Sequence, residues 1–184
     1  MPKLIENLRE RILADARQTL TDEGYRALSM RGLARRAGVA PGTLYNYFSS
    51  KDELVATIAL ADWRQVTSRM ECAASEAPSL PEGLAALLAA LDSFSGRYRS
   101  TWEQYDGAGA AGYAARYHRT LRDQVAAPVR TLARRLGRTD VADVADVLAE
   151  ALLACSVSAD LGTDQLVKLA SILDAARPEQ EDPA

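Results

Sequence analysis

The sequence predicts an all-α protein, with an N-terminal three-helix domain that contains a helix-turn-helix motif and a larger helical domain behind it. Apolar residues recur at intervals of three and four along most of the 184-residue chain, which is the spacing of amphipathic helices. Segment 29–48 has the pattern of two short helices around a tight turn, and no stretch alternates like a half-buried strand. We expect the first domain to span residues 1–50, the second residues 51–176, and residues 177–184 to form a disordered tail.

The two short helices are predicted at 30–37 and 41–47. Ser29 can cap the first one, because its hydroxyl can accept a hydrogen bond from a free backbone N–H. Gly38 ends that helix, since glycine takes the left-handed conformation after a helix without strain. Pro41 suits the first turn of the second helix, where its missing N–H costs nothing. Together these signals predict a helix-turn-helix.

The second of these helices is too short and too poor in apolar residues to belong to a core. Its outward residues have hydroxyl or amide groups, which can reach base edges and phosphate oxygens of DNA. They are Thr43, Tyr45, Asn46 and Tyr47. Gly42 has no side chain to hold the helix away from a partner. A helical hairpin without a partner would explain the apolar Leu44 and Phe48, but not this polar face.

A longer helix is predicted from Lys51 towards Ala74. Ser50 and Glu53 have the spacing of a capping box, with Ser50 as the N-cap. Lys51 in the first turn opposes the helix dipole, and a phosphate contact would explain its presence. One face of this helix is predicted to contain Leu54, Ile58, Ala61 and Gln65.

The stretch from Ser29 to Leu54 resembles the DNA-binding domain of the TetR family of bacterial transcriptional regulators. The matching residues are Ala34, Ala37-Gly38-Val39, Gly42-Thr43-Leu44-Tyr45, Tyr47-Phe48 and Lys51 through Leu54. The resemblance is strong over residues 8–55, and beyond them only the helical layout agrees. Two positions depart from the family pattern: Ala40 stands where the family often has a capping Ser, and Tyr47 where many members have His.

The resemblance implies a ligand-responsive regulator, most often a repressor, that binds double-stranded DNA as a homodimer on an inverted-repeat operator. We expect Thr43 and Tyr47 to contact base edges, and Gly42 to permit close approach. The other residues expected at the DNA are Ser29, Arg31, Ala40, Pro41, Tyr45, Asn46 and Lys51. An activator, or a regulator without a small ligand, fits the same residues.

The remaining helices follow from periodicity and from proline and glycine breaks. A helix at 4–21 precedes the helix-turn-helix, and Tyr25 and Leu28 are expected to fill the small core behind it. The later helices are expected at 82–99, 113–136, 140–159 and 163–176. The glycine-rich segment 106–112 is expected to form a loop or kink, and Pro128 a kink.

Six of the eleven aromatic residues lie between positions 94 and 117. They are Phe94, Tyr98, Trp102, Tyr105, Tyr113 and Tyr117. Aromatic side chains beside a glycine-rich break can form the wall of a small-molecule pocket, and TetR-family regulators have their effector pocket in this part of the chain. His118 would lie at the rim or on the surface. Ordinary core packing explains the same aromatic residues, and the sequence does not identify the effector.

The last two helices are the predicted dimer interface. In the first, apolar residues repeat by four and three in a heptad-like pattern, and the resemblance implies that both helices pair with the same helices of a second subunit. The expected interface residues are Val141, Ala145, Leu148, Leu152, Cys155, Leu166, Leu169 and Leu173. Closure of the subunit's own core is the alternative.

Composition argues against several other classes of protein. The net charge of −3 and the pI near 5.3 disfavour a non-specific architectural DNA binder, which would be strongly basic. Residues 1–55 carry nine Lys and Arg against seven Asp and Glu, whereas residues 56–184 carry thirteen against eighteen. The positive side therefore coincides with the helix-turn-helix. We find no nucleophile–base pair or phosphate-binding glycine loop of an enzyme built on a helical bundle.

Cysteine and histidine usage predicts no metal site and no cofactor. Cys72 and Cys155 are far apart, so we expect them to be reduced thiols, with redox sensing as the alternative.

The N-terminus is charged where a signal peptide is apolar, and the longest apolar run, 84–91, is too short to span a bilayer. We therefore expect a cytoplasmic protein without a membrane partner.

Overall fold

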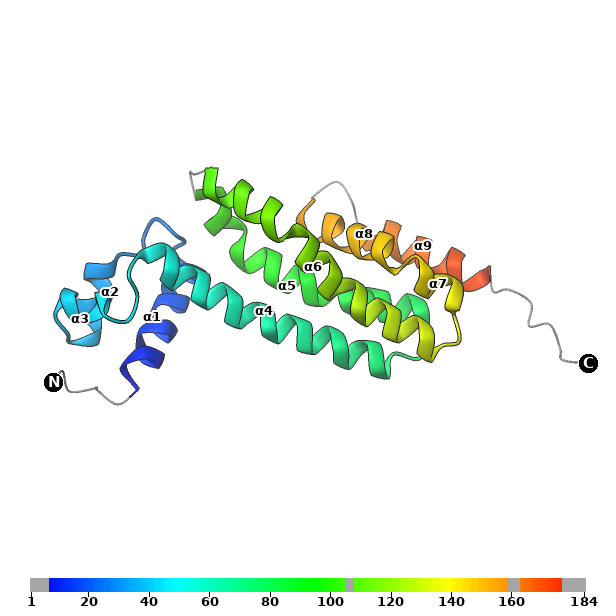
Figure 1. Cartoon of the computed structure of the whole chain (residues 1–184), viewed down its shortest axis with the longest axis horizontal. Coiled ribbons are helices and arrows are strands. Elements are labelled where there is room, and N and C mark those ends of the chain that lie inside the picture. Colours follow the sequence, from blue (N-terminus) through cyan, green and yellow to red (C-terminus); the bar gives the residue numbers. More distant parts are fainter. Residues whose placement is uncertain (1–6, 105–107, 159–162, 177–184) are drawn as a thin grey trace, which may run out of the picture. The chain divides into compact units, whose positions relative to one another are not determined.

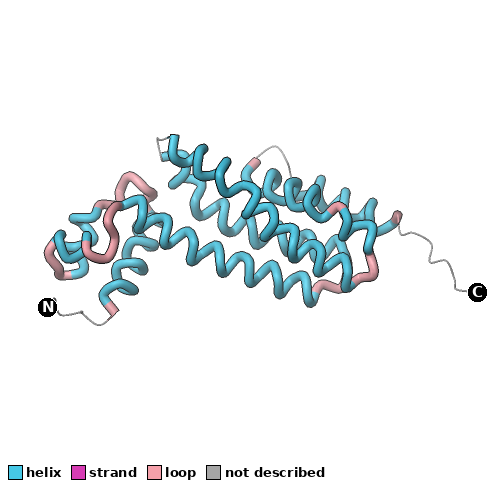
Figure 2. The backbone as a smooth tube through the Cα atoms, viewed as in Figure 1, coloured by secondary structure: helices cyan, strands magenta, loops and turns pink. Residues whose placement is uncertain are grey.

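The computed structural model describes residues 7–104, 108–158 and 163–176. Within these ranges the chain is helical with short connections and no strand (Figures 1 and 2). The helices are α1 (Leu8–Asp22), α2 (Met30–Ala37), α3 (Pro41–Tyr45), α4 (Lys51–Glu76), α5 (Leu80–Gln104), α6 (Ala108–Arg135), α7 (Thr139–Asp143), α8 (Ala145–Val157) and α9 (Thr163–Ala175). The all-α prediction, with a helix-turn-helix near the N-terminus, is confirmed.

Several predicted helix boundaries were wrong, and α5 is longer at both ends than the predicted 82–99. Helix α6 already begins at Ala108, so Gly109 and Gly112 are helical where a loop or kink was expected. The helix predicted at 140–159 is divided into α7 and α8 at Val144, whose N–H bonds to the carbonyl of Val141 three residues back and interrupts the α-helical ladder. The predicted tail, 177–184, lies outside the described residues.

The chain forms two compact units. The first contains residues 1–64 and 96–111, and the second contains residues 65–95 and 112–184. Helices α4, α5 and α6 therefore contribute to both units. The functional boundary predicted after residue 50 falls at the start of α4 and stays a prediction.

In the first unit, α1 to α3 and the start of α4 share one apolar core. Side chains from all four helices are fully buried in it, as their amphipathic spacing predicts. They include Leu8, Ile12, Leu20, Leu33, Leu44, Phe48, Leu54 and Ile58. Leu28, from the connection before α2, is also buried, as predicted. This core fixes the positions of the short helices α2 and α3, which could not be stable alone.

The buried face of α4 contains a carboxylate. Asp62 is 3% exposed, whereas Gln65, which we predicted on that face, is exposed. Oδ1 of Asp62 lies 2.8 Å from Nη2 of Arg17 on α1. Oδ2 accepts hydrogen bonds from Arg97 and Tyr98 on α5, both at 2.8 Å. Asp62 thus links three helices of the first unit.

In the second unit, α5 and α6 approach each other closely at a glycine. A Cβ atom at Gly83 would lie 2.3 Å from a methyl carbon of Leu132, well inside van der Waals contact. At the far end of α6, Arg135 donates a hydrogen bond of 3.1 Å to the carbonyl of Ala74 at the end of α4. Gly137, with φ of 71°, ends α6. Buried Arg138 then donates to the carbonyl of Leu173 at 2.6 Å, which ties α9 to this corner.

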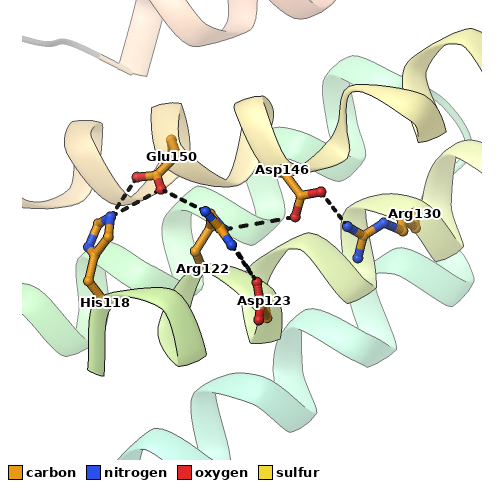
Figure 3. A network of polar contacts seen from close by, with 6 residues as sticks. All are labelled: His118, Arg122, Asp123, Arg130, Asp146 and Glu150. Carbon is orange, nitrogen blue, oxygen red and sulfur yellow. Dashed lines mark hydrogen bonds and ion pairs between the residues drawn. The ribbon is translucent and has the colours of Figure 1, made fainter. Parts of the chain in front are cut away.

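A row of charged side chains connects α6 to α8 (Figure 3). It consists of His118, Arg122, Asp123, Arg130, Asp146 and Glu150. Nε2 of His118 lies 2.9 Å from Glu150, and Arg130 donates to Asp146 at 2.7 Å. These side chains are half-buried or exposed, so each pair contributes little to stability. Their alternating charges nevertheless favour one register of α8 against α6.

Candidate nucleic-acid interface

The turn between α2 and α3 is held by local hydrogen bonds. The N–H of Gly32 donates to Oγ of Ser29 at 3.0 Å, which confirms the predicted N-cap. Gly38 has φ of 71°. Its N–H donates to the carbonyl of Arg35 at 3.2 Å, and the N–H of Val39 donates to Ala34 at 2.9 Å. The left-handed glycine and these two bonds end α2 and direct the chain into α3.

Helix α3 begins after Ala40, which makes no side-chain capping bond, and has Pro41 in its first turn. Leu44 and Phe48 are buried and anchor this segment to the core. The helix is shorter than predicted, since it ends at Tyr45 rather than at residue 47. With Leu44 and Phe48 buried, the side chains of Tyr45 and Asn46 between them are left exposed.

The predicted DNA-contact residues of α3 are accessible to solvent. Tyr45 is 49% exposed and Asn46 is exposed, whereas Thr43 and Tyr47 are half-buried. A Cβ atom at Gly42 would meet nothing within 4 Å, so this backbone can be approached from outside. The segment therefore offers hydroxyl, amide and bare backbone groups to a partner.

Helix α2 contributes exposed positive charge. Arg31 and Arg35 are exposed, whereas Arg36 turns back to α1 and donates to Asp15 at 2.9 Å. Oγ1 of Thr19 also accepts a bond from Arg36 at 2.9 Å. Arg36 thus fastens α2 to α1, which leaves Arg31 and Arg35 available to an anionic partner.

The start of α4 carries the predicted phosphate-binding lysine. The N–H of Glu53 donates to Oγ of Ser50 at 3.0 Å, so Ser50 is the N-cap as predicted. The reciprocal bond of the capping box goes to a different residue, since the carboxylate of Glu53 accepts from the N–H of Ser49 at 2.7 Å. The hydrogen bonds from Ser49 lower the pKa of Glu53. These bonds fix the end of the connection that leads into α4.

Lys51 is held against an aromatic ring. Its Nζ lies 3.8 Å from the ring centroid of Tyr25, in the connection between α1 and α2. The phenolic hydroxyl of Tyr25 donates to Oδ1 of Asp52 at 2.5 Å. Partial burial lowers the pKa of Lys51 and the charge of Asp52 opposes this. We predicted Tyr25 as part of the core, and sequence periodicity had no signal for its contact with Lys51.

This part of the chain matches known DNA-binding domains. Residues 12–58 match the model of bacterial regulatory proteins of the tetR family. The chain carries a TetR-family DNA-binding domain. It is 36% identical over 61 residues to the transcriptional regulator UidR of Escherichia coli, and 41% identical over 61 residues to the transcriptional repressor KstR of Rhodococcus jostii. The matched segments cover 33% of this chain, 31% of UidR and 29% of KstR, so the chain spans about a third of these relatives.

The likeness of the TetR-type fold extends beyond this domain. A crystal structure of a TetR/AcrR-family transcriptional regulator from Thermobifida fusca has a TM-score of 0.59 to this chain and 20% identity. The superposition covers 92% of this chain and 98% of that one. At this identity the likeness shows the fold alone. UidR, KstR and the Thermobifida fusca protein are transcriptional regulators and not enzymes.

The predicted effector-pocket residues are only partly described. Phe94 is half-buried, and Tyr98 is buried with its hydroxyl on Asp62. His118 is exposed and pairs with Glu150, which places it on the surface between α6 and α8. Tyr105 and the side chains of Trp102, Tyr113 and Tyr117 lie outside the described part of the structure. The pocket therefore stays a prediction.

The residues predicted at the dimer interface divide into two groups. Five are buried inside their own subunit: Val141, Ala145, Leu148, Leu152 and Leu166. Three retain exposed surface: Cys155 and Leu173, which are half-buried, and Leu169, which is exposed. Burial of the first group agrees with the alternative stated above, closure of the subunit's own core, and the dimer interface stays a prediction.

The described residues give little support for a metal site, a membrane-spanning helix or a reactive thiol. No group of three or more His, Cys, Asp and Glu there could hold a metal ion. None of the helices in those residues is long and apolar enough to cross a bilayer. Exposed Cys72 has a raised pKa because of its hydrogen bond to Glu76, and burial raises the pKa of Cys155. Both shifts disfavour the reactive thiolate.

Proposed function

We propose that this protein is a sequence-specific DNA-binding transcriptional regulator of the TetR family, which acts in the cytoplasm as a homodimer on an inverted-repeat operator. The observation that carries the proposal is the folded helix-turn-helix, with its polar segment accessible and its apolar anchors Leu44 and Phe48 buried. A second copy related by two-fold symmetry would present a second motif to the next major groove.

The exposed groups support a division of roles. Thr43 on α3 and Tyr47 just after it are proposed to contact base edges, which carry the sequence information. Tyr45 and Lys51, with Arg31 from α2, are proposed to contact phosphates, which set register and affinity. Gly42 is proposed to allow close approach, because a Cβ there would face open space.

The proposed dimer surface is the outer side of α8 and α9. Val147 is 68% exposed, Val157 70% and Ile172 59%, and Leu169 is exposed beside Ile172. Large apolar side chains left in water on two neighbouring helices are typical of a protein interface. The opposite sides of the same helices close the subunit core, so the two roles need not compete.

We further propose that the regulator is a repressor released by a small molecule. KstR, which resembles the N-terminal domain at 41% identity, is a repressor, which supports the direction of regulation. The effector would bind near Phe94 and Tyr98, in the aromatic part of α5. An activator with the same DNA-binding residues is the alternative, and a reporter gene placed behind the operator distinguishes the two.

The test is footprinting of the full chain on the DNA that flanks its own coding region, followed by binding isotherms on the protected duplex and on a random duplex. Lys51→Ala should weaken binding to both duplexes and reduce the salt dependence by about one counterion. Thr43→Ala should instead reduce discrimination at one base pair in each half-site, by about 1 kcal/mol. Arg69→Ala removes an exposed charge of α4 in the second unit and is the control. Equal wild-type affinity for both duplexes would overturn sequence-specific binding.

A further inference from the structure

Tyr25 contacts two oppositely charged neighbours at once. The ammonium of Lys51 lies over its ring at 3.8 Å, and its hydroxyl donates to the carboxylate of Asp52 at 2.5 Å. Lys51 and Asp52 are consecutive residues in the first turn of α4. One aromatic side chain therefore holds the cation on its face and the anion on its edge.

This arrangement offsets two effects that would weaken a phosphate contact by Lys51. A lysine beside an aspartate is attracted to it, and a paired ammonium has less of its charge available to a phosphate. The helix dipole also disfavours a cation in this turn. The ring attracts the ammonium through its quadrupole without neutralising it, and the hydroxyl bond occupies the competing carboxylate. The long lysine stem, with its many rotamers, is at the same time restricted to one direction.

We infer that Tyr25 is a positioning residue of the DNA interface: it holds the Lys51 ammonium ready for a DNA phosphate and keeps Asp52 away from it. The inference rests on the proposed function, because it assigns Tyr25 a role in the same interface. The group that Lys51 would bind in this position is the monoanionic phosphate diester of duplex DNA.

The experiment uses the full chain and the duplex that the wild-type protein protects, with affinity measured by fluorescence anisotropy over a range of salt concentrations. Tyr25→Phe keeps the ring and frees Asp52, and should weaken binding about threefold and reduce the salt dependence. Tyr25→Leu removes the ring as well and should weaken binding about fivefold, as expected for a loss near 1 kcal/mol. Ser75→Ala removes an exposed hydroxyl from α4 in the second unit, away from the proposed interface, and serves as the comparison.

Two double variants separate positioning from general support of the fold. Asp52→Asn added to Tyr25→Phe should restore the wild-type affinity and salt dependence, because no carboxylate remains to pair with Lys51. In a Lys51→Ala background, Tyr25→Phe should change the affinity by less than about 1.5-fold. Thermal unfolding of each variant gives the folded fraction by which affinities are corrected.

The outcomes are distinct. If Tyr25→Phe is as harmful with Lys51→Ala as without it, or if Asp52→Asn does not rescue it, Tyr25 supports the fold and the inference is wrong. If the wild-type protein binds no DNA, the proposed function fails and the inference fails with it. Coupling to Lys51 together with rescue by Asp52→Asn supports the inference.

Discussion

The phenolic hydroxyl of Tyr98 donates to Oδ2 of Asp62 at 2.8 Å, and both side chains are buried. The same carboxylate oxygen accepts from Arg97 at 2.8 Å, and the other lies 2.8 Å from Arg17. The carboxylate and the phenol are buried, while the two guanidinium groups retain contact with water. Asp62 is therefore the centre on which α1, α4 and α5 converge within the first unit.

Tyr98→Phe should lower the free energy of unfolding by about 1.5 kcal/mol, because a buried carboxylate loses one of its charge-assisted donors while the ring still fills its space. Urea denaturation followed by circular dichroism measures this. Tyr45→Phe, at an exposed position, should change stability by less than about 0.5 kcal/mol. Equal effects of the two substitutions would show that the Tyr98 hydroxyl contributes nothing through Asp62.

The stability contributed by Asp62 should depend on pH. Burial raises the pKa of Asp62, but hydrogen bonds from Arg97 and Tyr98 and the charge of Arg17 outweigh burial, and the net shift is below the usual 3.8. A carboxyl group with a lowered folded-state pKa stabilises above its unfolded pKa, and this stability is lost as pH falls through the folded value. The difference in unfolding free energy between wild type and Asp62→Asn should therefore be constant from pH 7 to about 5 and shrink below about 4. A difference that grows on acidification would contradict this sign.

Gly83→Ala should destabilise the second unit by about 1 to 2 kcal/mol, since the new methyl group would meet Leu132. Gly96→Ala is the matched control on the same helix, because a Cβ there meets nothing within 4 Å. It should be neutral or stabilise by up to about 1 kcal/mol through helix propensity. Thermal unfolding of the two variants distinguishes close packing from propensity, since propensity alone would stabilise both.

Ile172→Asp should weaken the proposed dimer at least about tenfold and leave the subunit folded, because it places a charge on exposed apolar surface. Sedimentation at several protein concentrations measures the dimer, and circular dichroism checks the fold. Leu60→Asp, at an exposed apolar position on α4, controls for loss of an apolar side chain elsewhere. Leu152→Asp should instead unfold the second unit, because Leu152 is fully buried. An unchanged dimer in Ile172→Asp would place the interface on another surface.

The sequence by itself determined the local parts of this protein. The cap at Ser29, the left-handed Gly38 and the start of α3 at Pro41 followed from bonds between residues at most five positions apart, and the structure has each of them. Such features depend on residue type and spacing alone, so they can be read without knowing the packing. The all-α fold followed in the same way from the spacing of apolar residues.

Tertiary structure decided which face is buried where a helix has apolar residues on more than one side. Helix α8 is apolar nearly all round, so periodicity could not tell that Leu148 and Leu152 face inwards while Val147 and Val157 stay exposed. The burial of Asp62 and the contact of Tyr25 with Lys51 join residues far apart in the chain. Such contacts depend on how helices pack and not on local bonding. The sequence could therefore show the helices and the helix-turn-helix. Only the structure showed that Asp62 joins three helices and that the ring of Tyr25 holds Lys51.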